Sequence, residues 1–218
     1  MADDDARHAA LLSALTTEHF VLQTAMSGTI AEAGARATLY VMALSSALVA
    51  IGFASRSREV LVPFVATVLV GVFLLGVLTT LRLIDTSLEN QQYLVGIARI
   101  RARYRALAPE APALFAPARG RWPEAGGSPS LGLGTVVAFL GTSATMVAVI
   151  NALVAGAGVA VLAADRLGPA RAPLAVWLGA ATAVLLVVAF YRFQRWRFAT
   201  FEPVLAWERE TQAPNATP

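Results

Sequence analysis

The sequence contains no cysteine and no lysine among its 218 residues. The absence of cysteine excludes disulfide bonds, thiolate metal ligands and cysteine nucleophiles. All 17 basic side chains are arginine, and charged residues make up only 14% of the chain, against 57% hydrophobic residues. That balance is too apolar for an ordinary soluble domain. The net charge of +3 is small, so the positions of the arginines are more informative than their number.

Ionisable side chains are also missing from four long apolar runs. These runs cover 37–55, 60–81, 131–164 and 172–191. Each approaches or exceeds the ~20 residues that an α-helix needs to cross the hydrocarbon core of a bilayer. Buried helices of a soluble bundle would carry polar faces, which these runs lack. We therefore predict an all-α polytopic membrane protein with four transmembrane helices and cytoplasmic helical extensions.

The chain is predicted to alternate between aqueous and membrane segments. Its acidic start has neither the basic region nor the apolar region of a signal peptide. The predicted segments are an N-terminal cytoplasmic helix (1–36), a first transmembrane pair (37–81), a basic helix with a Pro/Gly-rich linker (82–130), a second transmembrane pair (131–191) and an aromatic, basic C-terminal segment with a polar tail (192–218). The third apolar run is too long for one straight span. We expect it to tilt, break or project, with a helix start near Thr135.

Arginine placement predicts the orientation of the spans, because cytoplasmic loops carry the excess of basic residues. With the N-terminus inside, the internal segments hold thirteen arginines and the external loops hold four. We therefore expect a multi-pass protein of the inner cell membrane, with both termini and the middle loop in the cytoplasm. The arginines assigned as topology and lipid anchors are Arg82, Arg99, Arg101, Arg103, Arg105, Arg192, Arg195 and Arg197.

The stretch GIARIRARYRAL, residues 96–107, has an arginine at every second position from Arg99 to Arg105. It is one short basic turn without a recognised binding motif, tethered close to a span, so we expect no nucleic-acid partner. On a helix the same region has an apolar face, here called the assembly seam, which consists of Tyr93, Ile97, Ile100, Tyr104 and Leu107. Three covers for this seam remain open: the helix at 6–35, a second copy of the chain, or a protein partner.

Small residues form flat faces on the predicted spans. In the third span they recur at alternating spacings of four and three, at Gly134, Ala138, Gly141, Thr145, Ala148 and Ala152. The fourth span has a shorter face of this kind with Ala175, Gly179 and Ala183. Flat faces allow close backbone approach where no hydrophobic effect drives association between helices. We therefore expect the third span at the centre of the bundle.

A few polar side chains lie within the predicted spans, among them Ser45, Ser46 and Asn151. Two interpretations are open for them. Hydrogen bonds between helices would make them structural. A pore lining or a polar ligand pocket would make them functional.

Signatures of catalysis are missing from the sequence. There is no Walker loop, no GxSxG and no HExxH motif, and the two histidines, His8 and His19, have no fitting acidic neighbour. We expect these histidines to be solvated. The prediction is accordingly a protein that is not an enzyme, with no metal and no cofactor.

Three stretches carry a resemblance to known proteins. They are EHFVLQTA at 18–25, RATLYVMALSSALVAIGF at 36–53 and LRLIDTSLENQQYLVGIARIRARY at 81–104. The chain resembles uncharacterised actinobacterial multi-span membrane proteins in these stretches. Its layout is more distantly similar to two-span membrane effectors of nucleotide-signalling defence systems, which implies a membrane-disturbing role. Four spans and the lack of a recognisable sensor domain depart from that second pattern.

Two functions follow as hypotheses. The first is an oligomeric effector or channel-like assembly of this chain, in contact with membrane lipids. The second is a membrane adaptor or accessory subunit that docks a protein partner on the helix at 82–107.

Overall fold

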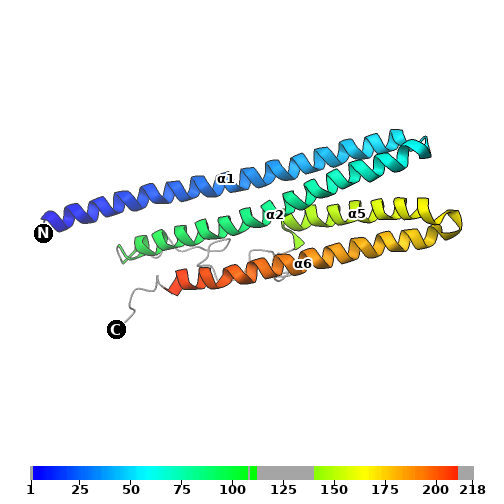
Figure 1. Cartoon of the computed structure of the whole chain (residues 1–218). Coiled ribbons are helices and arrows are strands. Elements are labelled where there is room, and N and C mark those ends of the chain that lie inside the picture. The colour runs from blue at the N-terminus through cyan, green and yellow to red at the C-terminus, as the bar shows by residue number, and fades with distance from the viewer. Residues whose placement is uncertain (1, 108, 112–139, 211–218) are drawn as a thin grey trace. The chain divides into compact units, whose positions relative to one another are not determined.

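The computed structural model describes residues 2–107, 109–111 and 140–210, and every element among them is a helix. Four long helices dominate (Figure 1): α1 (Ala2–Ala54), α2 (Arg58–Arg105), α5 (Ser143–Leu167) and α6 (Ala172–Glu210). A short 3₁₀ helix, η1 (Pro169–Arg171), precedes α6. The predicted all-α class is confirmed for this part of the chain. All four long helices are long and apolar enough to cross a membrane.

Helices α1 and α2 continue well past the apolar runs. The 53 residues of α1 correspond to ~80 Å of helix, more than twice the ~30 Å thickness of a hydrocarbon core. The helix expected at 6–35 and the first apolar run are thus one element. Its first turn holds Asp3, Asp4 and Asp5, whose charge suits the positive end of the helix dipole. Helix α2 likewise joins the second apolar run to the arginine-rich stretch and ends at Arg105.

The expected helix start near Thr135 lies outside the described residues, and α5 follows a break at 141–142. Residues 131–139 lie outside the described residues, and the helix starts at Ser143. The hydroxyl of Thr142 caps it by accepting a hydrogen bond of 3.3 Å from the backbone N–H of Thr145. The long apolar run is therefore interrupted before its middle. Gly168 ends α5 with a φ of 76°, a conformation that glycine adopts without strain.

The chain divides into two compact units. Unit 1 comprises Met1–Glu32, Thr86–Ala138 and Phe198–Pro218, and unit 2 comprises Ala33–Asp85 and Phe139–Arg197. Both α1 and α2 begin in one unit and end in the other, whereas α5 belongs wholly to unit 2. The boundaries of unit 2 fall four to eight residues from the outer ends of the predicted apolar runs.

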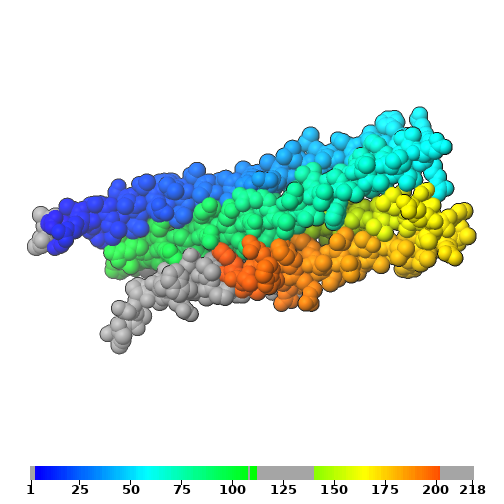
Figure 2. Space-filling view, viewed as in Figure 1, coloured from blue at the N-terminus to red at the C-terminus, as the bar shows by residue number. Residues whose placement is uncertain are grey.

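Unit 2 is built from two helical hairpins, α1 with α2 and α5 with α6 (Figure 1). Two close approaches fix the register of α2 against α5. A Cβ on Gly158 would lie 3.3 Å from Leu69, and a Cβ on Gly76 would overlap the side chain of Asn151. Seven residues forward along α2 thus correspond to seven residues back along α5, so these helices are antiparallel. In the space-filling view α5 lies between α2 and α6 (Figure 2).

Unit 1 contains the N-terminal part of α1 packed against the C-terminal part of α2. The hydroxyls of Thr16 and Tyr104 lie 3.3 Å apart, and the ring of His19 meets that of Tyr104 edge-on at 6.4 Å. A Cβ on Gly96 would lie 2.9 Å from Leu22, so glycine allows the close approach of the helices there. His19 is half-buried in this contact instead of solvated, contrary to the sequence expectation.

Candidate functional site in the interior of unit 2

Asn151 is a buried polar residue in the interior of unit 2 that hydrogen-bonds to two other helices. Its Oδ1 accepts a hydrogen bond of 3.2 Å from the Tyr40 hydroxyl, and its Nδ2 donates one of 3.1 Å to the carbonyl of Phe73. The amide therefore joins α5 to both α1 and α2. Gly76 makes room for it, because any side chain at that position would occupy the same space. Neither Tyr40 nor Gly76 is identifiable as a partner from the sequence alone.

A second polar cluster joins α5 to α6. The side chain of Gln194 is buried at 1% exposure. Its Oε1 accepts a hydrogen bond of 3.2 Å from the Thr145 hydroxyl, and its Nε2 donates one of 3.5 Å to the Thr142 hydroxyl. The two threonine hydroxyls are themselves 2.9 Å apart. Sequence analysis missed Gln194, whose one signal is an amide side chain among the aromatic and basic residues that follow the fourth apolar run.

The backbones of α5 and α6 meet at two glycines. A Cβ on Gly156 would lie 2.6 Å from the carbonyl oxygen of Gly179 and 2.9 Å from the methyl group of Ala183. A Cβ on Gly179 would in turn overlap the carbonyl oxygen of Gly156 and lie 2.7 Å from the methyl group of Ala160. Such a close contact forms only where both residues lack a side chain. The small-residue face predicted for the fourth span contributes Ala175, Gly179 and Ala183, which are all buried.

Ion pairs connect the two hairpins at opposite ends of unit 2. A guanidinium nitrogen of Arg58 lies 2.8 Å from a carboxylate oxygen of Asp165, at the end where the helices of each hairpin are joined. Arg197 and Asp85 pair at 2.8 Å where α2 and α6 leave unit 2. Along α2, the stretch from Arg58 to Asp85 corresponds to roughly 40 Å of helix. Between them the interior holds only uncharged side chains among the described residues.

Only three of the six residues predicted to form the packing face of the third span are buried in α5. Thr145, Ala148 and Ala152 are buried in α5. Gly141 lies before the start of α5 and is exposed, so it does not belong to the packing face of that helix. Gly134 and Ala138 lie outside the described residues. The close contact with Gly179 of α6 is made by Gly156 and Ala160, four positions apart.

The assembly seam is covered within the chain itself. Ile97 is 1% exposed, Ile100 is buried, Tyr93 and Tyr104 are half-buried, and Leu107 is exposed beyond the end of α2. The N-terminal part of α1 contributes to this cover, because it contacts Tyr104 and lies beside Tyr93 and Ile100 in unit 1. This is one of the three covers that the sequence left open.

The remaining predicted residues lie at the surface or partly buried. Ser45 and Ser46 are exposed, and the hydroxyl of Ser46 donates a hydrogen bond of 2.9 Å to the carbonyl of Met42 within its own helix. Among the predicted arginine anchors, the exposed ones are Arg99, Arg103, Arg192 and Arg195, and the half-buried ones are Arg82, Arg101, Arg105 and Arg197. The guanidinium of Arg195 also stacks over the ring of Tyr191 at 5.9 Å.

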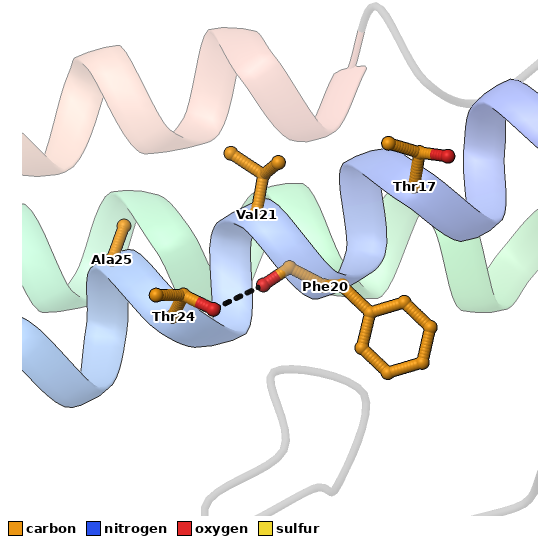
Figure 3. Close-up of a pocket in the computed structure, with 5 residues that line it drawn as sticks. All are labelled: Thr17, Phe20, Val21, Thr24 and Ala25. Carbon is orange, nitrogen blue, oxygen red and sulfur yellow. Dashed lines mark hydrogen bonds between the residues drawn. The ribbon is translucent and has the colours of Figure 1, made fainter.

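Two hollows in unit 1 offer little for chemistry. The first, of about 560 Å³, is open and is lined by Thr17, Phe20, Val21, Thr24 and Ala25, all on α1 (Figure 3). The Thr24 hydroxyl donates its hydrogen to the Phe20 carbonyl, so it can only accept a hydrogen bond from a ligand. The second, of about 430 Å³, lies between α1 and α2 and includes Glu18, Gln92 and Arg99. No cluster of three metal-ligating side chains occurs among the described residues.

Comparison of the chain with protein-family models, with curated proteins and with solved structures gave no match. The resemblance to actinobacterial multi-span membrane proteins therefore stays a prediction, and the function has to be argued from the physical character of the two units.

Proposed function

We propose that this protein is a four-span integral membrane protein that acts without catalysis, as an oligomeric effector or channel-like assembly. The observation that carries this proposal is the distribution of side chains in unit 2. Its surface presents large apolar side chains such as Trp177 (73% exposed), Phe53 and Leu185, while its interior holds Thr145, Asn151 and Gln194.

Exposing these apolar side chains costs free energy in water, whereas in lipid their exposure is favourable. Large contiguous apolar surfaces are rare on soluble monomers. In hydrocarbon the same side chains are solvated by acyl chains, and helices associate through small residues and interhelical hydrogen bonds. The Gly156–Gly179 contact and the Asn151 hydrogen bonds supply both. The ion pairs at the two ends of unit 2 then lie near the two membrane surfaces.

The orientation proposed from the arginines puts unit 1 and both termini in the cytoplasm. Arg58 and Asp165 then pair at the external surface, and Arg197 and Asp85 pair at the cytoplasmic surface. Reporter fusions after Arg58 and Leu167 should report an external location, and fusions after Ala125 and Pro218 a cytoplasmic one. A cytoplasmic signal from the Leu167 fusion would refute the four-span topology.

The channel-like role is supported by the polar interior of unit 2, and it is tested in liposomes. Purified protein reconstituted alone should permit ion flux that a matched preparation of empty liposomes lacks. Electrical silence of correctly inserted protein would refute the channel-like role.

An adaptor role is the second candidate, and one observation favours it. Phe20 (61% exposed) and Val21 lie exposed on α1 in unit 1, which the proposed topology puts in water. The seam on α2 is less available to a partner, because Ile97 and Ile100 are already buried within the chain. Inert liposomes together with capture of a defined partner on the Phe20 face would favour this role.

A further inference from the structure

Thr80 has an unusual hydroxyl for a helical threonine. The residue is 5% exposed, and its buried Oγ1 has no hydrogen-bond partner among the described residues. Threonines at the surface of these helices, such as Thr38 and Thr182, donate to the carbonyl of the residue four positions earlier, at 2.9 and 2.8 Å. A buried hydroxyl without a partner costs free energy, so such groups in folded proteins usually meet ordered water.

The register of α2 against α5 shows what surrounds this hydroxyl. Thr80 follows Gly76 by four residues, so it lies on the same face of α2, one turn nearer to Asp85. By the antiparallel register it lies level with Val147 and Ala148 of α5. Those side chains carry no polar atom that could bond to the Thr80 hydroxyl.

Polar groups continue from Thr80 toward the Asp85 end of unit 2. Thr79, the preceding residue, is also buried. About one turn farther on lie Thr145 and Gln194 with their hydrogen bonds. The Asp85–Arg197 pair follows, and its side chains are exposed by more than a third. Polar side chains therefore occur at successive levels from the buried interior to an accessible end.

The part of unit 2 between Asn151 and the Arg58–Asp165 pair is apolar and closely packed. There Leu69 packs on Gly158, and the backbones of Gly156 and Gly179 touch. Val65, buried at 2% exposure, lies on α2 beyond them. A contact between backbones leaves no room for water.

We propose that the part of unit 2 between Asn151 and the Asp85–Arg197 pair is a hydrated vestibule. Water enters beside the ion pair, hydrogen-bonds to the Thr80 hydroxyl and stops at Asn151, because the packing of Leu69 of α2 on Gly158 of α5 closes the path beyond. Its ligands are water and small neutral solutes with hydrogen-bonding groups. The assignment of its mouth to the cytoplasm rests on the proposed membrane topology. In a channel-like assembly, separation of Leu69 from Gly158 is the step that opens it.

The absence of cysteine makes this proposal directly testable, because each introduced thiol is the only one in the chain. Thiols react with charged methanethiosulfonates as thiolates, so reaction requires both water and access. The test variant is Thr80→Cys, which is nearly isosteric, in full-length protein in liposomes. Its matched controls are Val65→Cys in the closed half, Leu78→Cys on the apolar surface and Ser57→Cys in the turn after α1.

We expect Thr80→Cys to react at least ~100-fold faster than Val65→Cys, because a hydrated thiol retains its thiolate fraction, which changes tenfold for each pKa unit. Reagent on the cytoplasmic side alone should suffice for Thr80→Cys, whereas Ser57→Cys, which the proposed topology puts outside, should react with reagent on the external side. Thr80→Cys that reacts no faster than Val65→Cys, while Ser57→Cys reacts readily, would overturn the vestibule. Leu78→Cys that reacts as fast as Ser57→Cys would instead overturn the membrane insertion on which the vestibule rests.

A second variant gives a readout that does not depend on labelling. In a dry interior, Thr80→Val removes an unpartnered hydroxyl and should raise the Tm. In a hydrated one it removes a water-binding group and should leave the Tm unchanged or lower it. A raised Tm would therefore count against the vestibule even if Thr80→Cys were difficult to label.

Discussion

Gly76 of α2 lies so close to Asn151 of α5 that the space for a Cβ at position 76 is already filled by the asparagine amide. The two residues therefore depend on each other, because the lack of a side chain at Gly76 leaves the space that the Asn151 amide fills. Through this amide α5 contacts α1 and α2. Substitutions at Gly76 and Asn151 can therefore measure what the amide hydrogen bonds contribute to stability, apart from the contribution of the surrounding apolar packing.

Gly76→Ala should destabilise the protein by about 1–3 kcal/mol, because the added methyl group displaces the amide from its two partners. Gly71→Ala on the same helix is the matched control, since a Cβ at Gly71 would have no other atom within 4 Å. The control should be neutral or stabilising by about 1 kcal/mol. Thermal melts in detergent measure both. Adding Asn151→Ala to Gly76→Ala should recover part of the loss, and strict additivity of the two changes would contradict the proposed relationship.

Tyr40→Phe should cost about 0.6–2 kcal/mol, the range for a hydrogen bond between helices in a membrane protein. The phenyl ring keeps the packing, so the loss reports the bond to Asn151 alone. A double-mutant cycle with Asn151→Ala should show that the two changes are coupled. Independent effects would mean that the hydroxyl contributes through another contact.

Gly179→Ala should weaken the second hairpin by about 1–3 kcal/mol, since its methyl group would meet the backbone of Gly156 and the methyl group of Ala160. Gly52→Ala on α1 adds the same group in open space and serves as control. The measurement is the thermal midpoint in detergent, together with cross-linking between α5 and α6. Equal behaviour of the two variants would show that the glycine contact is not close in the folded protein.

Ile97→Glu with Ile100→Glu should loosen α1 from α2 in unit 1, because two carboxylates would replace side chains that the chain itself buries. Limited proteolysis should then cut the first thirty or so residues faster, while membrane insertion persists because the spans are intact. Phe20→Glu with Val21→Glu changes exposed positions instead. That pair should leave proteolysis unchanged and should affect only cross-linking between copies or capture of a partner. Unchanged proteolysis in the isoleucine variant would show that the seam is not held by α1.

The sequence predicted helices better than it predicted their neighbours. Apolar runs of bilayer length identify the helices because span length is fixed by a physical thickness. The face of α6 with Gly179 and Ala183 was also visible, since small residues recur on one side. Its partner was not, because the spacing of small residues defines a surface without naming what lies against it. Gly179 contacts Gly156. Gly156 lies outside the alternating spacing of small residues that predicts the packing face of the third span.

Polar partners were harder still to foresee. Asn151 was noticeable as a lone amide in an apolar run, but its bonds to Tyr40 and the Phe73 carbonyl depend on the register between helices that are far apart in sequence. Gln194 lies among arginines and aromatic residues in the sequence, so one more polar side chain there does not predict a buried position. Ser45 and Ser46 were equally noticeable and are exposed. A hydroxyl can bond to its own helix, so its presence in a span does not specify a neighbour.

The glycine contact joins residues of adjacent helices, whereas the bonds between hairpins close much longer loops. Tyr40 and Asn151 are 111 positions apart, and Arg197 and Asp85 are 112 apart. Short-range contacts close with less loss of chain entropy, so each hairpin should form as it is synthesised and the two should join afterwards. Biogenesis would then have a late step in which the first hairpin waits in the bilayer for the second. Substitutions at Asn151 would act at that step, and would leave two intact hairpins that fail to meet.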